Sequence, residues 1–145
     1  MSAGAQRGFL DILAVEDNPG DAYMLREAFS RIGSKSRITV AQDGQEALDF
    51  LGTRNDSFGA RRPDLILMDL KLPGKDGLEV LAEIKQQEKL QMIPVIIMTS
   101  SGAAEDISRA YRLCANCYIV KPPDFNSLVE TVSLIEKFWL RVALP

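Results

Sequence analysis

Short apolar runs alternate along this chain with longer stretches whose apolar residues recur every three or four positions. Each short run is aliphatic or β-branched and is bounded by polar or turn residues, which is typical of a buried strand. These runs begin near Asp11, Arg37, Asp64, Ile93 and Cys117. The stretches between them have the spacing of amphipathic helices. The pattern therefore predicts five successive strand–helix units.

Turn and capping residues mark the predicted helix starts. Asn18-Pro19 begins the first helix, because proline is favoured at the first helical position, and Gly33 is a candidate for its C-cap. Further helices are expected to begin at Asp43-Gly44 and at Lys75-Asp76-Gly77. A fourth helix is expected to carry Ile107, Ala110, Tyr111 and Cys114, and a fifth to run from about Asp124 to beyond Trp139.

Alternating strands and helices imply an α/β fold, in which a parallel sheet is covered by helices on both faces. Because crossovers are right-handed, few topologies remain, and a flavodoxin-like (βα)5 doubly wound sheet with strand order 2-1-3-4-5 is the expected one. We expect a single domain over residues 11–139, an N-terminal extension over 1–10 and an apolar C-terminal tail over 140–145. The stretch from Thr53 to Arg62 is interpreted as a solvated loop.

Two of the predicted strands end in acids. The strand at 12–15 is followed by Glu16-Asp17, and the strand at 65–68 by Asp69. In the predicted order these two strands flank the switch point, where open α/β sheets bind ligands. Three converging carboxylates repel one another unless a cation or phosphoryl chemistry uses them, and Mg²⁺ prefers a few carboxylates with water and phosphate.

Simpler roles remain open for the same residues. Asp17 or Asn18 could cap the first helix, and Asp69 could be a turn residue before Leu72-Pro73. Each simpler role is reasonable alone, but all of them meeting at one switch point would be a coincidence.

The next two predicted strands end in a hydroxyl and in a lysine. Thr99-Ser100-Ser101 follows the fourth strand, where it could cap a helix or aim a hydroxyl at a phosphoryl oxygen. Lys121-Pro122 follows the fifth, and a lysine at a buried strand end is costly unless it meets an anion. These parts match an aspartyl-phosphate site. Asp69 would be the nucleophile, Asp17 and Asp69 would hold Mg²⁺, and Lys121 and Thr99 would bind phosphoryl oxygens.

Composition narrows the function further. The 145 residues are 46% hydrophobic and carry a net charge of −3, which fits one globular domain and gives no nucleic-acid footprint. No apolar run approaches the roughly 20 residues that cross a bilayer, and the start of the chain has no signal-peptide pattern, so we expect a cytoplasmic protein without membrane contact. The chain has no histidine, so any phosphohistidine must lie on another protein.

Cys114 and Cys117 form a CxxC pair, a spacing found in redox pairs and zinc sites. A thioredoxin-type pair lies just after a strand at a helix N-terminus, whereas this pair lies between a helix pattern and a strand. No histidine or further cysteine is present to complete a zinc site. We therefore expect two small, buried packing residues.

The chain resembles a response-regulator receiver domain of two-component signalling over roughly Asp11 to Trp139. The resemblance rests on four elements in order, which are Glu16-Asp17, Asp69, Thr99 and Lys121-Pro122. The family's aromatic switch residue lies three residues before the lysine, here Tyr118. Two departures are small: Glu16 replaces the commoner aspartate, and Pro123 follows Pro122.

The resemblance implies a function. Asp69 would take a phosphoryl group from a phosphohistidine of a sensor histidine kinase, in a reaction that the domain itself catalyses, together with the later dephosphorylation, without being a classical enzyme. The backbone carbonyl of Lys71 would complete the Mg²⁺ shell, with Mn²⁺ as an alternative ion, and Glu16 would act through water. Thr99 would then move toward the phosphate and Tyr118 would turn inward.

The last predicted helix has more apolar surface than a core stripe needs. The stripe has a 3.6-residue period and consists of Leu128, Val132, Ile135, Trp139 and Val142. Outside it lie Leu134, Phe138 and Leu140, which form either a wider core face or an interface. We expect a symmetric homodimer, with Leu134, Phe138, Trp139 and Leu140 at its interface.

A narrower resemblance involves the same segment. Asn116-Cys117-Tyr118, Phe138-Trp139-Leu140 and the closing Leu144-Pro145 are similar to single-domain regulators that partner cyanobacterial and bacterial phytochromes. That resemblance implies a red-light-regulated histidine kinase as the phosphodonor and a homodimer through the last two helices and the tail. It implies no bilin site on this chain.

Other functions fit less well. A haloacid-dehalogenase-type phosphatase needs a second aspartate where Lys71 stands, and a flavodoxin phosphate loop would be repelled by Glu16-Asp17. No P-loop motif is present. A DNA-binding regulator would need an output domain after the last helix, where few residues remain. A pseudo-receiver, a protein-binding adaptor that takes no phosphate, is the main alternative, against which the intact acidic set argues.

Overall fold

The computed structural model describes residues 8–52 and 62–142. Its five strands are all parallel and pair in the order β2-β1-β3-β4-β5. Their bounds are β1 Asp11–Val15, β2 Arg37–Ala41, β3 Leu65–Met68, β4 Val95–Thr99 and β5 Cys117–Val120. The predicted flavodoxin-like α/β fold and its strand order are confirmed, although β4 begins at Val95 rather than near Ile93.

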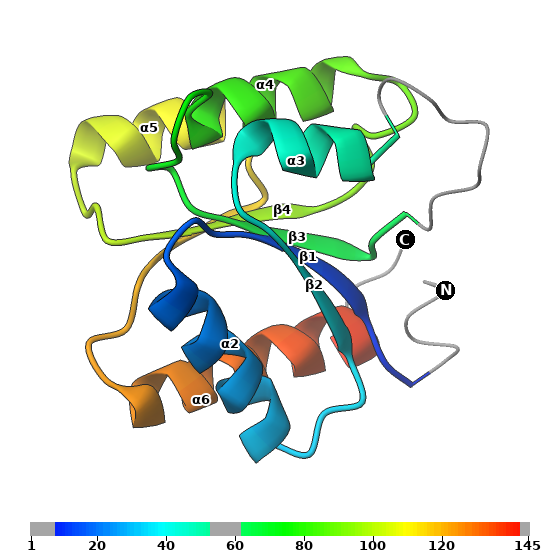
Figure 1. The fold of residues 1–145 in the computed structure, drawn as a ribbon, viewed down its shortest axis with the longest axis vertical. Helices are drawn as coiled ribbons and strands as arrows, with labels where there is room; N and C mark the ends of the chain where they lie inside the picture. The colour runs from blue at the N-terminus through cyan, green and yellow to red at the C-terminus, as the bar shows by residue number, and fades with distance from the viewer. Residues whose placement is uncertain (1–7, 53–61, 143–145) are drawn as a thin grey trace.

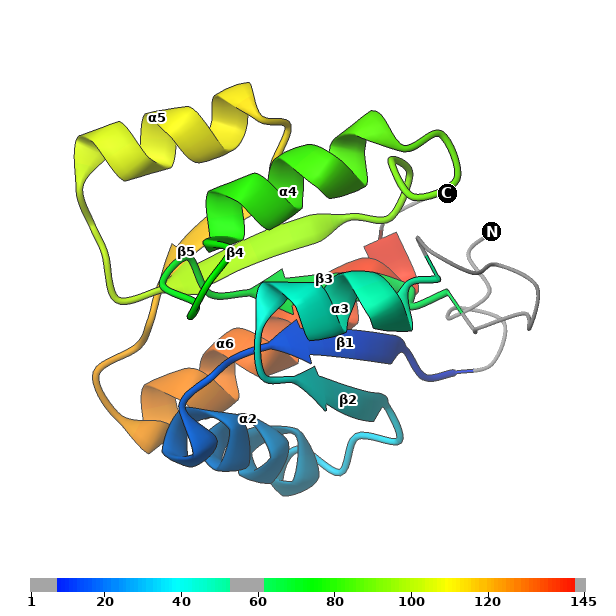
Figure 2. The same cartoon turned by 45° about the horizontal axis from the view of Figure 1, so that its top comes forward.

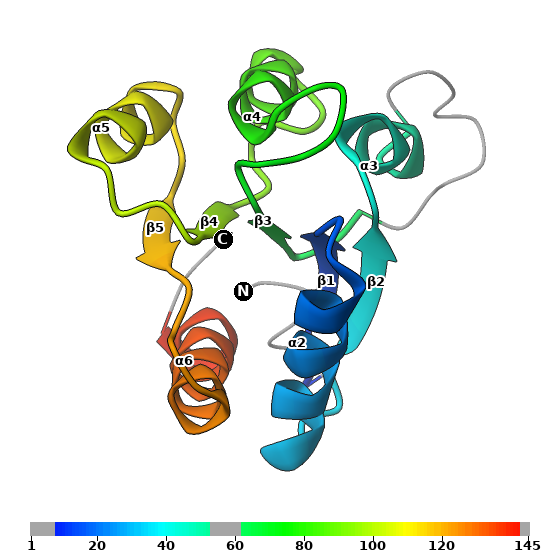
Figure 3. The same cartoon turned by 60° about the vertical axis from the view of Figure 1, so that its left-hand side comes forward.

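Helices cover both faces of the sheet (Figure 1). Figures 2 and 3 show α2 and α6 on one face and α3, α4 and α5 on the other. Their bounds are α2 Pro19–Arg31, α3 Gly44–Phe50, α4 Gly77–Gln86, α5 Ala104–Arg112 and α6 Phe125–Lys137, with a π-helical turn η1 over Phe138–Val142.

Four helices begin at the capping residues that the sequence marks. Asn18, Asp43, Asp76 and Asp124 each accept the backbone N–H of the residue three positions on. Each bond satisfies a backbone donor that a helix start otherwise leaves unpaired. The exception is α5, whose N-cap Ala103 has no side-chain cap. Thr99, Ser100 and Ser101 are therefore not the N-cap of this helix.

The sheet separates two apolar cores. Every residue of β3 and β4 is buried, as expected for central parallel strands covered on both faces. Successive residues of a strand alternate between the cores: Ile66 and Met68 pack toward α3 and α4, whereas Leu65 and Leu67 pack toward α2 and α6. Leu10 is 1% exposed and its N–H donates to Ser36 Oγ, so this residue of the segment before β1 joins the core.

The burial predicted for Cys114 is wrong. Helix α5 ends at Arg112, and Cys114 is exposed with φ of +72°. The N–H of Ala115 reaches the carbonyl of Ala110, which closes the helix in the manner of a Schellman motif and places Cys114 at the left-handed position. Ala115 is buried in its place, whereas Cys117 is partly buried against the α2/α6 core. The loop from Thr53 to Arg62 lies outside the described residues, except for Arg62.

The last helix divides the predicted interface residues into two pairs. Val132 and Ile135 are buried as the core stripe predicts. Leu134 is 68% exposed and Phe138 48% exposed, so they present apolar surface on α6 and η1. Trp139 and Leu140 instead pack partly buried against the core beneath α6.

Candidate phosphoryl-acceptor site

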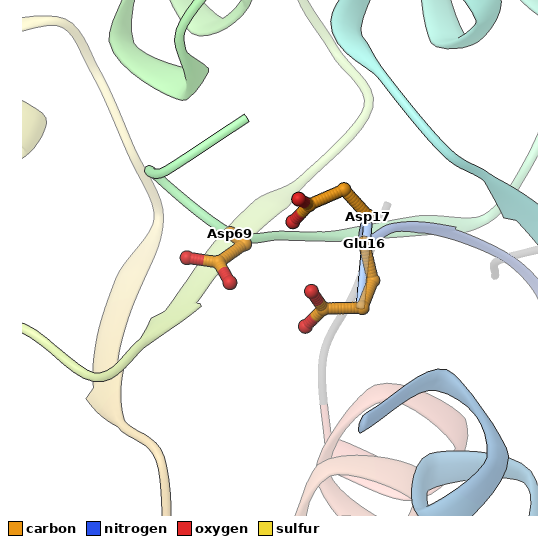
Figure 4. A group of neighbouring side chains, drawn as sticks. All are labelled: Glu16, Asp17 and Asp69. Atoms are coloured by element: carbon orange, nitrogen blue, oxygen red, sulfur yellow. The ribbon is translucent and has the colours of Figure 1, made fainter. Parts of the chain in front are cut away.

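Three carboxylates converge at the carboxyl ends of β1 and β3. In Figure 4 the side chains of Glu16 and Asp17 lie beside Asp69, and one carboxylate oxygen of each residue lies within 4.8 Å of the others. Glu16 and Asp69 are each 8% exposed, whereas Asp17 is exposed. Their backbone is held by the sheet, since the N–H of Glu16 donates to Ala41 and that of Asp69 to Val15. The switch point therefore gathers the acids that the sequence predicts there.

Lys121 carries the positive charge of the site. It follows β5, and its backbone N–H donates to the carbonyl of Thr99 at 2.8 Å. Its ammonium Nζ lies 2.7 Å from Glu16 Oε1, 2.8 Å from Asp69 Oδ2 and 2.8 Å from Asp21 Oδ2. The predicted meeting of Lys121 and Asp69 thus occurs, with two further carboxylates bound to the same cation.

The charges in this cluster shift one another. Burial raises the pKa of Asp69, but the hydrogen bond and charge of Lys121, together with Thr99 and the N–H of Lys71, outweigh it, so that the pKa lies below its ordinary value of 3.8. Burial also raises the pKa of Glu16, and there it outweighs Lys121, leaving the pKa above 4.5. Burial would lower the pKa of Lys121, yet the surrounding carboxylates raise it well above its ordinary value. Asp69 is therefore ionised, and Lys121 protonated, at neutral pH.

Local hydrogen bonds settle the simpler roles of these residues. Asn18 caps α2 and its own N–H donates to Glu16 Oε2 at 3.1 Å, so Asp17 is not the cap. Asp69 does act as a turn residue, because its Oδ1 accepts the N–H of Lys71 at 3.2 Å. The turn role and a chemical role coexist: the bond from Lys71 fixes the carboxylate while Lys121 binds its other oxygen.

Helix α4 fits tightly against the loop that carries Asp69. The N–H of Gly77 donates to the carbonyl of Leu70 at 2.8 Å. A Cβ atom at Gly77 would lie 2.3 Å from the backbone oxygen of Asp69 and 2.7 Å from the Cα of Leu70. Only glycine allows this approach, so Gly77 holds the backbone of Asp69 in place.

Thr99 is the last residue of β4 and is fully buried. Within residues 8–52 and 62–142 its Oγ1 has no hydrogen-bond partner, although it lies close enough to Asp69 to contribute to the lowered pKa of that carboxyl. A buried hydroxyl without a partner is costly and rare. An acceptor on Asp69 would satisfy it.

Tyr118 bonds to the loop before α5 and to α5 itself. Its hydroxyl donates to the carbonyl of Ser101 at 2.8 Å, and its backbone N–H donates to the hydroxyl of Tyr111. Ser101 in turn donates to Asp106 in the first turn of α5. The predicted inward turn of Tyr118 would break the bond to Ser101.

Asp21 is the site residue that the sequence reasoning missed. It lies in the first turn of α2, and its side chain is 48% exposed. The available signal was its position, because a helix that starts after β1 turns its first residues toward the same sheet edge as Asp17. A first-turn acid is also favoured by the helix dipole alone, so this signal by itself was ambiguous.

The donor set fits a hard divalent cation. Carboxylate oxygens from Glu16, Asp17 and Asp69 are close enough to share one ion, and Asp17 is open to water. The five charged groups Glu16, Asp17, Asp21, Asp69 and Lys121 leave the cluster strongly negative, which a divalent cation would offset. An ionised, fixed carboxylate beside an ammonium and a buried hydroxyl is suited to accept an electrophile that carries negative oxygens.

Comparisons with known proteins agree with this geometry. The family model for the response regulator receiver domain matches residues 12–133. The probable methanogenesis regulatory protein FilR2 of Methanothrix harundinacea is 43% identical over 129 residues, which cover 89% of this chain and 83% of that protein. Response regulator Rcp1 of Synechocystis is 41% identical over 135 residues, 92% of each chain.

Solved structures extend the likeness to three dimensions. The phosphorylated cyanobacterial phytochrome response regulator RcpA superposes with a TM-score of 0.86 at 41% identity, covering 94% of this chain and 97% of that one. The Mn²⁺-bound form of Rcp1 gives a TM-score of 0.82 at 38% identity, covering 93% and 97%. Among the described residues, no helix is both long and apolar enough to cross a membrane.

Proposed function

The chain belongs to the response regulator receiver domain family of two-component signalling, and we propose that it accepts a phosphoryl group on the Asp69 carboxylate from the phosphohistidine of a sensor histidine kinase. The observation that carries the proposal is the ionised Asp69 carboxylate, which lies 2.8 Å from Lys121 Nζ and beside Glu16 and Asp17. These 145 residues contain no histidine, so the phosphohistidine of this transfer lies outside them.

In the proposed transfer, an electron pair of an Asp69 carboxylate oxygen forms the new O–P bond. The P–N bond to the kinase imidazole breaks, and its electron pair stays on the imidazole nitrogen. Lys121 pairs with one phosphoryl oxygen, and the hydroxyl of Thr99, which has no partner among the described residues, donates to another. A divalent cation, Mg²⁺ or alternatively Mn²⁺, held by Asp17, Asp69, the Lys71 carbonyl and through water Glu16, would neutralise charge on the phosphoryl group.

Thr99 and Tyr118 would transmit the change. Movement of Thr99 toward the phosphoryl oxygen opens space behind β4, and Tyr118 turns inward as its bond to Ser101 is lost. Because Ser101 also bonds Asp106, this movement alters the start of α5. The face made by α5, β5 and α6 would be the output surface.

We further propose a homodimer and a phytochrome-type kinase as the partners. Leu134 and Phe138 supply exposed apolar surface for the dimer, while Trp139 and Leu140, which are partly buried, support them from beneath. The similarity to the phytochrome response regulator RcpA supports a phytochrome-type kinase as the phosphodonor. We propose the cytoplasm as the location of both proteins. Light scattering with and without beryllofluoride measures whether the wild type is a dimer. If Leu134→Glu has the same dimer mass as the wild type, this surface is not the interface.

Intact-protein mass after incubation with acetyl phosphate and Mg²⁺ tests the acceptor directly. We expect a gain of one phosphoryl group in the wild type and none in Asp69→Asn or with EDTA. Asp43→Asn is the matched control, since it also removes one aspartate and asparagine caps α3 equally well. A gain retained in Asp69→Asn would exclude this acceptor. If a folded wild type gains no mass but binds beryllofluoride, its phosphate is short-lived. If it does not bind beryllofluoride either, the chain is a pseudo-receiver that acts as a protein-binding adaptor.

A further inference from the structure

Three carboxylates share the ammonium of Lys121, the group that would bind a phosphoryl oxygen. An ammonium has three N–H donors, and three carboxylates lie within 2.8 Å of Lys121 Nζ. Glu16 takes one donor, Asp69 another and Asp21 the third. A phosphoryl oxygen on Asp69 therefore has no free donor on Lys121 until one of these bonds is released.

The burial of the three partners decides which bond is released. The side chain of Glu16 is 10% exposed, so leaving its carboxylate unpaired costs desolvation without recovery of hydration. The side chain of Asp69 is 9% exposed, and when its other oxygen takes the phosphoryl group, Oδ2 remains a buried carbonyl acceptor for Lys121. The side chain of Asp21 is 48% exposed, and water can solvate it as soon as Lys121 leaves. Asp21 and Lys121 also line one cavity of about 220 Å³ together with Asp69, which gives the side chains room to separate.

We propose that Asp21 is a positioning residue that holds the third donor of Lys121 in the unphosphorylated protein and surrenders it to the phosphoryl group. This inference rests on the proposed phosphorylation of Asp69. The Asp21–Lys121 ion pair exists in one state only, so it stabilises the unphosphorylated state relative to the phosphorylated one. Asp21 thereby shifts the equilibrium between the two states toward the unphosphorylated one.

Removing the pair should shift that equilibrium in a defined direction. Asp21→Asn keeps the shape of the side chain but replaces the charged acceptor with a weaker, neutral one, so Lys121 releases this donor to the incoming group more readily. We expect beryllofluoride, in the presence of Mg²⁺, to bind about twofold to fivefold more tightly, the range that a partly exposed ion pair supports. Asp21→Glu restores a carboxylate and should return the affinity toward that of the wild type.

Asp124→Asn separates the specific pair from a general charge effect. Asp124 is exposed and lines the same cavity, but its carboxylate is bonded to Ser127 rather than to Lys121, and asparagine preserves the cap of α6. This variant loses the same charge and should bind beryllofluoride as the wild type does. Melting temperatures measured in EDTA verify that each variant is folded.

The test is a calorimetric titration of beryllofluoride into these four proteins at saturating Mg²⁺. Tighter binding by Asp21→Asn alone supports the competition. Unchanged or weaker binding by Asp21→Asn would overturn it, and so would an equal gain in Asp124→Asn, which would show that only the lost charge matters. A folded wild type that does not bind beryllofluoride would instead sink the proposed phosphorylation, so the two failures are distinguishable.

Discussion

Two half-buried lysines hold opposite ends of the sheet in opposite ways. Lys121, beyond the carboxyl end of β5, has three carboxylates around its ammonium. Lys85, in the last turn of α4, donates to three neutral oxygens at the amino ends of β4 and β5. These are the carbonyls of Gln91 at 3.1 Å and Ile93 at 3.0 Å and the side chain of Asn116 at 3.1 Å.

The difference in partners produces opposite shifts of the two pKa values. Burial acts to lower both, and at Lys85 it prevails, so that the pKa lies below its ordinary value of 10.5. At Lys121 the carboxylates outweigh burial and the pKa is raised. A cation among carboxylates can exchange one of them for an incoming anion, whereas a cation among carbonyls holds backbone segments together. Asn116 reinforces that fastening, since it also accepts the N–H of Val95 at 2.9 Å.

The largest expected effect follows the loss of Lys121. Lys121→Met removes the charge that binds the phosphoryl oxygen, and we expect phosphorylation by acetyl phosphate to slow by about a hundredfold or more. Mg²⁺ should bind more tightly, because the ammonium no longer competes for Glu16 and Asp69. Rates come from intact mass and affinities from calorimetry. A phosphorylation rate near that of the wild type would contradict the role given to Lys121.

Lys85→Met should lower the stability of the protein and leave its phosphorylation unchanged. Its three acceptors lose a charged donor, which costs about 1–2 kcal/mol in the free energy of unfolding. Phosphorylation should continue at the wild-type rate, because Lys85 lies at the far end of the sheet. Urea unfolding and intact mass measure the two quantities on one sample. Slower phosphorylation in a folded Lys85→Met protein would contradict the purely structural role given to Lys85.

Thr99→Val tests whether the unpartnered hydroxyl at the carboxyl end of the sheet lowers the stability of the free protein. The hydroxyl is fully buried and has no partner among the described residues, so a methyl group of similar size should leave stability unchanged or raise it by up to about 1 kcal/mol. Beryllofluoride should bind more weakly, since one donor to it is lost. Denaturant unfolding without Mg²⁺ gives the first quantity, and a marked loss of stability would show that the hydroxyl is satisfied in the free protein.

Alkaline pH gives the smallest effect and separates the lysines by sign. Lys85 has a lowered pKa in the fold, so the unfolded chain holds its proton more tightly and stability rises with pH as 10.5 is approached. Lys121 has a raised pKa, so its contribution is fully present below 10.5 and is lost only above it. From about pH 8 to pH 10, stability relative to Lys85→Met should increase, while stability relative to Lys121→Met stays constant. If the stability relative to Lys85→Met and the stability relative to Lys121→Met changed in the same direction, the opposite pKa shifts of the two lysines would be contradicted.

Local signals predicted most of the fold. The caps Asn18, Asp43, Asp76 and Asp124 act within four residues, and their chemistry is legible in the sequence. Strand order followed from handedness and from the number of units. Cys114 escaped prediction because the end of α5 depends on which carbonyls the following N–H groups reach, and a non-glycine residue at the left-handed position gives no sequence signal.

The site was predictable as far as strand ends determine it. Glu16, Asp69, Thr99 and Lys121 occupy strand ends that a parallel sheet brings together. The bond from Lys121 to Asp21 was not predictable, because it joins the first turn of α2 to the end of β5 across 100 positions of sequence. The sequence also did not predict that Leu134 and Phe138 are exposed while Trp139 and Leu140 pack on the core. That difference depends on the direction that η1 takes after the end of α6.

The most direct test of the account is to locate the phosphoryl group on the chain. Borohydride reduces an acyl phosphate to an alcohol, and tandem mass spectrometry of the protein treated with acetyl phosphate and Mg²⁺ then identifies the reduced residue. We predict reduction at Asp69 alone, and at wild-type levels in Lys85→Met. Reduction at Glu16, Asp17 or Asp21 in a folded wild type would contradict it.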